Sequence, residues 1–174
     1  NGIPCNGDAP VTYTLSTTSP GEIYIPNASG MGWKGGDTLL IPAGTYSIIE
    51  IDSFGGDPCK NIYIRNVGGQ VVVTTAMRFK KDVHYVVIEG KDSAGITYGF
   101  KTKGFTFSRV SWFTMRRVEI GPNPDGVGIY GKQDPDGVQA NSYTKYTMRK
   151  ITVDRCFIHD VLGEGMYIGH TYPN

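Results

Sequence analysis

Short runs in which apolar and polar residues alternate recur along the chain and predict a series of β-strands. Alternation with a period of two is typical of strands buried on one side, and clusters of Gly and Pro usually bound such strands. Before residue 37 the runs are short, at residues 11–15 and 22–25, and Pro42-Ala43-Gly44 predicts a sharp turn after the first long run. From residue 37 onwards the expected strands cover residues 37–41, 46–51, 61–65, 70–75, 84–89, 95–100, 105–108, 111–120, 126–130, 148–158 and 164–169.

The same pattern appears more than once at regular distances. The eight residues that begin at Phe113 resemble the eight that begin at Tyr146, at an offset of 33 residues (146 minus 113). Weaker copies begin at Tyr85, 28 residues earlier (113 minus 85), and at Asn61, 24 residues before that (85 minus 61). Repeats of roughly 20–50 residues are typical of stacked units, none of which buries its apolar face alone.

The length and content of the repeated unit favour one architecture. A propeller blade needs about 40–45 residues and four strands, whereas a unit of roughly 24 residues with two or three short strands fits a coil of a parallel β-helix. Longer units then contain loop insertions at one corner, such as residues 131–146. The sequence therefore predicts an all-β, right-handed parallel β-helix of about five coils at residues 37–174, behind an irregular N-terminal cap at residues 1–36.

The alternation also predicts which side chains lie inside the helix. Trp112 begins a strand of the repeat and is expected in the core. The apolar side chains expected to stack in the interior are Leu39, Ile41, Ile62, Ile64, Val71, Val73, Val86, Ile88, Val118, Ile120, Ile151 and Ile158.

Composition and charge narrow the function classes. The chain has 174 residues, enough for one domain with a core, and its 24 Gly residues suit short strands joined by tight turns. The formal net charge of +1 gives no reason to expect a nucleic-acid partner. No stretch approaches the ~20 apolar residues of a membrane helix, so no membrane span is expected.

Two segments carry a resemblance to a known family. The sequence GDTLLIPAGTY at residues 36–46 resembles the opening coil of right-handed parallel β-helix proteins of the pectate-lyase-like superfamily. The sequence FIHDVLGEGMYIGHT at residues 157–171 resembles a coil common in secreted bacterial members. The superfamily includes polysaccharide lyases, glycoside hydrolases, adhesins and phage tailspikes, and the tandem Asp pair of polygalacturonases is missing here. The resemblance implies a secreted or cell-surface protein that engages polysaccharide.

That resemblance leaves open whether the chain is an enzyme. If it is, a polysaccharide lyase is favoured over a glycoside hydrolase; the alternative is a noncatalytic structural or adhesive module of a larger surface assembly. No cofactor is expected, although a bound calcium ion stays open. Because an uncapped coil exposes strand edges that invite pairing, we expect the natural protein to continue, or a partner to cover the C-terminal coil.

A basic stretch is the first candidate for substrate binding. Nine bases and three acids lie between residues 77 and 117. Coils of a β-helix stack about 4.8 Å apart, so outward bases on successive coils would form a ladder for an acidic polysaccharide. The alternative is that these bases are solvated and guard against edge pairing. The residues assigned to substrate binding on these and the following grounds are Lys80, Lys101, Arg117, Lys150 and His170.

The repeat itself supplies a second candidate. At an offset of 33, Arg116 and Arg117 lie directly beneath Arg149 and Lys150, one coil away. Such cations could hold a uronate carboxylate and stabilise the charge that develops during β-elimination. In the alternative interpretation only one residue of each pair points outwards, and Glu119 or Asp154 neutralises it.

A cluster near the C-terminus supplies the third candidate, with His159, Asp160, Glu164, Tyr167 and His170 within twelve residues. Two carboxylates that flank a bend suit glycoside hydrolysis, whereas His and Tyr could act as base and acid in a lyase. The spacing does not support a metal site. The alternative is turn-forming acids and a Tyr stack between coils. The catalytic candidates are therefore Arg116, Arg149, His159, Asp160, Glu164 and Tyr167.

The three cysteines differ in their surroundings. Cys5 and Cys59 lie in turn-rich stretches, whereas Cys156 lies inside an expected strand, where a lone Cys usually acts as a small hydrophobe. In an oxidising compartment we expect a Cys5–Cys59 disulfide that joins the cap to the helix, with Cys156 free and buried. The alternative is three reduced thiols in an intracellular protein.

Overall fold

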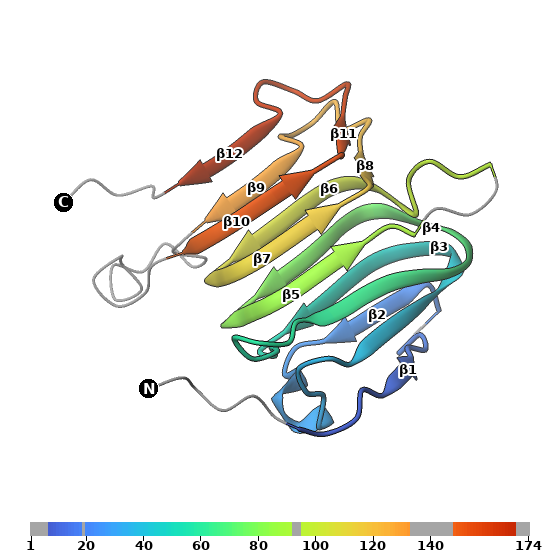
Figure 1. Cartoon of the computed structure of the whole chain (residues 1–174). Helices are drawn as coiled ribbons and strands as arrows, with labels where there is room; N and C mark the ends of the chain where they lie inside the picture. The colour runs from blue at the N-terminus through green and yellow to red at the C-terminus, as the bar shows by residue number, and fades with distance from the viewer. Residues whose placement is uncertain (1–6, 19, 92–94, 133–147, 170–174) are drawn as a thin grey trace.

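The computed structural model describes residues 7–18, 20–91, 95–132 and 148–169. It is an all-β parallel solenoid of about four turns, which confirms the predicted fold class with one turn fewer than expected. Figure 1 shows the turns stacked from the blue N-terminal end to the red C-terminal end, and all pairings between the labelled strands are parallel. The strands are β1 (Thr12–Thr14), β2 (Glu22–Ile25), β3 (Thr38–Asp52), β4 (Ile62–Lys80), β5 (Val83–Glu89), β6 (Phe100–Ser108), β7 (Val110–Arg116), β8 (Val118–Ile120), β9 (Ile129–Lys132), β10 (Arg149–Asp154), β11 (Phe157–Ile158) and β12 (Met166–Gly169), with a short 3-10 helix at Ala28–Met31.

The strands form three faces. The first face contains β1, the beginnings of β3 and β4, and then β5, β7 and β10. The second face contains the middle parts of β3 and β4, the beginning of β6, and β8 and β11. The third face contains β2, the ends of β3, β4 and β6, and β9 and β12. Since β1 and β2 pair with β3, the strands expected at residues 11–15 and 22–25 are confirmed and belong to the first turn.

Two of the expected turns are bends inside continuous strands. β3 runs through Pro42-Ala43-Gly44, where its register on β4 shifts between Pro42 and Gly44. β4 likewise runs through Gly68 and Gly69, whose φ angles are 77° and 141°. Because glycine adopts such angles without steric cost, the chain rounds a corner without leaving the ladder. The prediction of separate strands on either side of these glycines was wrong.

The interior is built as the alternation predicted. Ten of the twelve predicted interior side chains are at most 1% exposed, and Ile151 and Ile158 are half-buried against the same core. Sequence reasoning missed the large aromatic part of the core, which consists of fully buried rings packed on one another. These rings are Phe79, Phe105, Phe107 and Phe113, and Phe100 is a further fully buried ring.

The register of β10 on β7 differs from the repeat seen in the sequence. Ile151 lies opposite Phe113, an offset of 38 residues (151 minus 113) rather than 33. At an offset of 33, the bend that begins with Gly121-Pro122 would coincide with Asp154-Arg155, within a run that has no Gly or Pro. The observed register places that bend on residues 159–163 instead, where Gly163 has a φ of 74°. Turn chemistry therefore decides the register.

The stacking of basic pairs predicted from the repeat was therefore wrong. Arg116 lies opposite Asp154, and Arg149 lies opposite Ser111. The offset between β5 and β7 also differs from the expected one by one residue, since Val86 rather than Tyr85 lies opposite Phe113. A slip of one residue exchanges the inward and outward faces of a strand, so this difference decides which side chains reach solvent.

Candidate functional site

The outward side chains of the first face form two parallel rows. Outward and inward positions alternate along a strand, and the parallel register stacks equal positions on successive turns. One row is rich in hydroxyl groups and consists of Thr12, Thr38, Tyr63, Val87, Thr114 and Thr152. The other, which we call the charged row, consists of Arg65, Glu89, Arg116 and Asp154.

Charges alternate in sign along the charged row. Arg65 Nη2 lies 2.8 Å from a Glu89 carboxylate oxygen, and Arg116 contacts both Glu89, at 3.4 Å, and Asp154, at 3.1 Å. Burial raises the pKa of Glu89, but hydrogen bonds from Arg65 and Arg116 outweigh that effect and leave the pKa below its ordinary value. Arg116 is thus neutralised by carboxylates, as the alternative interpretation of the sequence held for Asp154.

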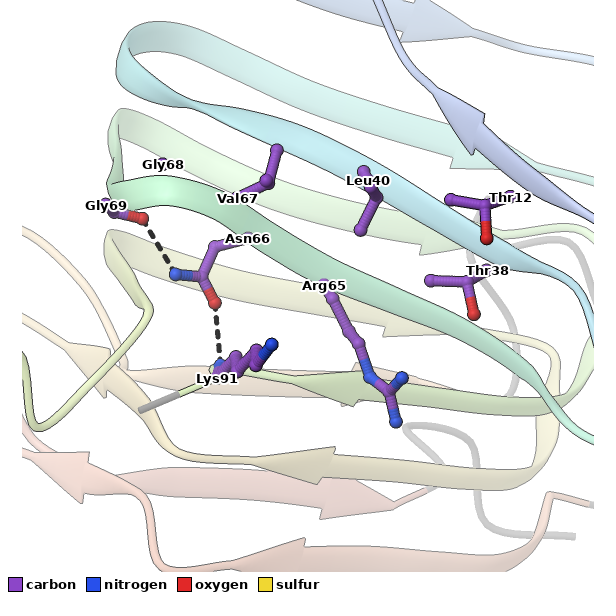
Figure 2. Close-up of a pocket in the computed structure, with 9 residues that line it drawn as sticks. All are labelled: Thr12, Thr38, Leu40, Arg65, Asn66, Val67, Gly68, Gly69 and Lys91. Carbon is purple, nitrogen blue, oxygen red and sulfur yellow. Dashed lines mark hydrogen bonds between the residues drawn. The ribbon is translucent and has the colours of Figure 1, made fainter. Parts of the chain in front are cut away.

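A groove of about 440 Å³ opens where the first face meets the corner of β4 (Figure 2). Its floor is partly apolar, from Leu40 and Val67, and Figure 2 shows the side chain of Lys91 extending toward that of Arg65. We call it the corner groove; its lining residues are Thr12, Thr38, Leu40, Arg65, Asn66, Val67, Gly68, Gly69 and Lys91.

Asn66 fixes the rim of the corner groove. Its side chain is 4% exposed, its Nδ2 donates to the Gly69 carbonyl at 2.7 Å, and its Oδ1 accepts from the Lys91 amide at 2.6 Å. The carboxamide therefore ties the corner of one turn to the backbone of the next, as the dashed lines in Figure 2 show. A Cβ at position 99 would lie 2.1 Å from Asn66 Oδ1, so the fit requires Gly99.

A second groove, of about 420 Å³, opens at the other edge of the first face. The rings of Tyr85 and Trp112 stack in it, with centroids 4.9 Å apart and planes 21° apart. Thr114 and Thr152 supply hydroxyl groups and Lys150 an exposed ammonium group. We call it the aromatic groove; its lining residues are Pro58, Asn61, Tyr85, Trp112, Thr114, Lys150 and Thr152.

One backbone feature builds the aromatic groove. Tyr85, Trp112 and Lys150 occupy the same position on successive turns, just before the inward residues Val86, Phe113 and Ile151. Their φ angles are 51°, 48° and 52°, in the left-handed region that is uncommon for large side chains. Trp112 is therefore half-buried beside the groove and does not lie in the core, contrary to the prediction. The same conformation recurs at Arg109, Arg117 and Arg155, each between two strands, so it is a general feature of the solenoid backbone.

The residues assigned to substrate binding are dispersed. Lys80 lies 3.1 Å from Glu50 and Lys101 lies 2.6 Å from Glu119, so both bind carboxylates of neighbouring turns. Arg117 occupies a corner position with a φ of 54°. Lys150 lines the aromatic groove, and His170 lies outside the described residues.

The structure brings together part of the C-terminal cluster. His159 Nδ1 lies 2.9 Å from Asp160 Oδ2, and Nε2 lies 3.3 Å from Glu119 Oε1. The hydrogen bond with Asp160 raises the pKa of His159 above its ordinary value, against the opposing effect of burial. Because both ring nitrogens face carboxylates, the arrangement favours an imidazolium that donates twice rather than a free base.

The remaining catalytic candidates lie elsewhere. Glu164 is exposed in the bend before β12, and Tyr167 stacks on Tyr130 on the third face, with centroids 5.5 Å apart. Arg149 is exposed at the start of β10. In the part of the chain that the structure describes, no ion pair joins Glu164 to His159.

Sequence reasoning missed most of the groove residues. Arg65 and Asn66 were not assigned to binding, and Lys91 was counted only as one of the nine bases between residues 77 and 117. Tyr85 and Trp112 each precede an inward residue by one position, and this shared spacing was the available signal for the aromatic groove. It could be recognised only with the right offset between the two turns.

The described residues include two of the three cysteines and contain no candidate metal site. Cys156 is a free thiol, as predicted, but it is half-buried rather than buried. Cys5 lies outside the described residues, so its pairing with Cys59 stays a prediction. No group of three or more His, Cys, Asp and Glu side chains is placed to hold a metal within the described ranges. Within those ranges there is also no helix of the length and apolarity needed to cross a bilayer.

Comparison with known proteins finds no matching family model, no matching curated protein and no matching solved structure. The two grooves of the first face, with the charges and rings that line them, are therefore the main basis for inferring a function. Their combination of aromatic rings, hydroxyl groups and basic side chains sets the class of ligand that they could hold.

Proposed function

We propose that the protein is a secreted or cell-surface β-solenoid that binds polysaccharide on its first face. The aromatic groove carries this proposal. Ligand sites typically combine apolar and aromatic lining with a few well-placed polar groups, and a sugar ring has both apolar C–H surfaces and hydroxyl groups. Tyr85 and Trp112 supply the aromatic surface, and Asn61, Thr114 and Thr152 supply hydrogen-bonding groups.

The charges that line the grooves suit an acidic polysaccharide. Neither groove is lined by a carboxylate side chain. The corner groove contains the basic side chains of Arg65 and Lys91, and the aromatic groove contains that of Lys150. No ion pair is recorded for either ammonium group among the residues described, and both side chains are exposed. A concave surface with charges of one sign raises the local concentration of ligands of the opposite sign.

The geometry favours binding over cleavage. Arg116 is neutralised by Glu89 and Asp154, and His159 is held between two carboxylates, so neither is poised as the free cation or base that β-elimination needs. A noncatalytic binding or adhesive module is thus the better-supported form of the proposal. Membership of the pectate-lyase-like superfamily, and with it a lyase activity, rests on the resemblance of residues 36–46 and 157–171 alone.

Calorimetry with a panel of soluble polysaccharides, including polygalacturonate, tests the proposal. Trp112→Ala should weaken binding by roughly tenfold or more, about 1.4 kcal/mol. Tyr24→Ala is the control, because Tyr24 is 48% exposed on the third face, away from the aromatic groove. Circular dichroism establishes that both variants fold. Binding that is unchanged in Trp112→Ala, or absent for every polysaccharide, would refute the proposal.

A further inference from the structure

We infer that the second face carries a separate binding site for a neutral sugar, formed by Tyr98, Phe157, Glu119 and Gln70. A groove of about 350 Å³ opens there, next to β8 and β11. The site lies on a different face from the two grooves described above, so a ligand bound to it would be independent of the polysaccharide proposed for the first face. The lining residues are Gln70, Gly95, Ile96, Thr97, Tyr98, Glu119 and Phe157.

An exposed aromatic ring is the first observation. Phe157 points outwards and is 47% exposed, on a row whose preceding members are Lys101 and Glu119. A large apolar side chain in such a row gains little by burial on folding. The rings of Tyr98 and Phe157 lie 6.0 Å apart and only 18° from parallel, and Phe157 stacks on His159 at 4.5 Å. The result is an ordered aromatic surface that faces solvent.

The polar groups around this surface are held in place by the protein. Gln70 Nε2 donates to the Tyr98 carbonyl at 2.9 Å, which positions the segment that carries the Tyr98 ring. Lys101 and His159 both contact Oε1 of Glu119, at 2.6 Å and 3.3 Å. Among the residues that the structure describes, no partner is recorded for Glu119 Oε2, so this oxygen could accept a ligand hydroxyl group.

The charges in this region point to a neutral ligand. Lys101 and His159 balance Glu119 and Asp160, so the cluster has no excess charge when His159 is protonated. An acidic sugar would place its carboxylate against Glu119, the charged side chain that lines the groove. A neutral pyranose instead offers hydroxyl groups to Glu119 Oε2 and C–H surfaces to the aromatic rings. The two faces therefore select sugars of different charge.

Calorimetry with neutral polysaccharides (a soluble β-glucan, a mannan and a galactan) and with polygalacturonate tests the inference. Phe157→Ala and, separately, Tyr98→Ala should each weaken binding of a neutral polysaccharide by about tenfold. Neither should change binding of polygalacturonate. Trp112→Ala should weaken binding of polygalacturonate and leave binding of the neutral polysaccharide unchanged. Leu162→Ala is the control, because Leu162 is 61% exposed in the bend that follows β11 and does not line the groove.

The outcomes separate this site from the function proposed for the first face. If no neutral polysaccharide binds, or if both aromatic variants bind it as tightly as the wild type, the second site is refuted. If the second site is refuted in this way and Trp112→Ala still weakens polygalacturonate binding, the function proposed for the first face stands. If Phe157→Ala weakens acidic and neutral polysaccharides equally, the two faces do not act independently and the inference is overturned.

Discussion

The Nε atom of Arg116 lies 3.1 Å from the Oδ2 atom of Asp154 on the next turn of the solenoid. The pair forms because the two turns are offset by 38 residues (154 minus 116), which places a carboxylate where a cation was expected. Like charges directly opposite each other on neighbouring strands are destabilising, and opposite charges are stabilising. The charged row is therefore first a structural feature of the first face.

The charged row predicts a loss of stability in acid. The pKa of Glu89 is lowered in the folded state, so its contribution is fully present above the unfolded pKa of about 4.3 and is lost as the pH falls through the lower folded value. Glu89→Gln should lower the free energy of unfolding at neutral pH and flatten its decline in acid. Urea unfolding between about pH 3 and pH 6 measures both effects.

Asp125→Asn is the control for the charged row. Asp125 is also ion-paired, with Lys103, but its side chain is 79% exposed. Exposed pairs contribute little, so this variant should remain within about 0.5 kcal/mol of the wild type at neutral pH. An acid dependence in Glu89→Gln as steep as that of the wild type would contradict a role for Glu89.

Asn66 predicts a second stability effect. Asn66→Ala would remove the acceptor of the Lys91 amide and the donor to the Gly69 carbonyl at a buried corner. Leaving such groups unpaired typically costs about 1–3 kcal/mol each, so a loss of at least about 1 kcal/mol is expected in urea unfolding. Asn27→Ala, at an exposed position, should change stability by less than about 0.5 kcal/mol. Equal effects of the two variants would refute the structural role of Asn66.

Strands and core were predictable because burial imposes a simple rule on the sequence. Inward positions of a β-solenoid alternate with outward ones, and residues such as Ile64, Ile88 and Val118 follow this rule visibly. The register between turns was not predictable from local similarity. Thr114-Met115-Arg116 resembles Thr147-Met148-Arg149, but pairing is decided by where the bends fall, and Gly163 fixes one of them far from that motif.

The site was harder to predict than the fold. Trp112 was expected inside because it begins a strand of the repeat, yet its φ of 48° turns the backbone so that the ring lies beside Tyr85 in a groove. Non-glycine residues rarely adopt that conformation, so residue propensities do not predict it. Likewise the bases counted along residues 77–117 are mostly paired, because their acids come from other turns, as with Lys80 and Glu50.

His159 predicts a pH dependence of the opposite sign. Its pKa is raised, so its contribution to stability is fully present below the unfolded pKa of about 6.5 and is lost as the pH rises through the higher folded value. The free energy of unfolding should therefore decline between about pH 6 and pH 9, and His159→Gln should remove that decline.

His84→Gln is the control for the histidine effect, because the recorded hydrogen-bond partner of His84 is the backbone carbonyl of Asp82 rather than a carboxylate. NMR titration of the His159 ring gives its pKa directly. A midpoint at or below about 6.5 would contradict the clamp formed by Asp160 and Glu119.

The last prediction concerns the three cysteines. Burial raises the pKa of the Cys156 thiol, and the thiolate is the form that reacts. Native protein should therefore alkylate slowly at Cys156 and rapidly once unfolded, without any reductant.

If Cys5 and Cys59 form the predicted disulfide, neither reacts with iodoacetamide until a reductant is added, and non-reducing peptide mapping recovers the two peptides joined. Closing a loop of this size stabilises by roughly 4 kcal/mol in the chain-entropy model, so reduction should lower the melting temperature. Cys156→Ser separates the effects, because it removes the slow thiol and leaves the bridge intact. Alkylation of Cys5 in the native, unreduced protein would refute the bridge and weaken the case for secretion that rests on it.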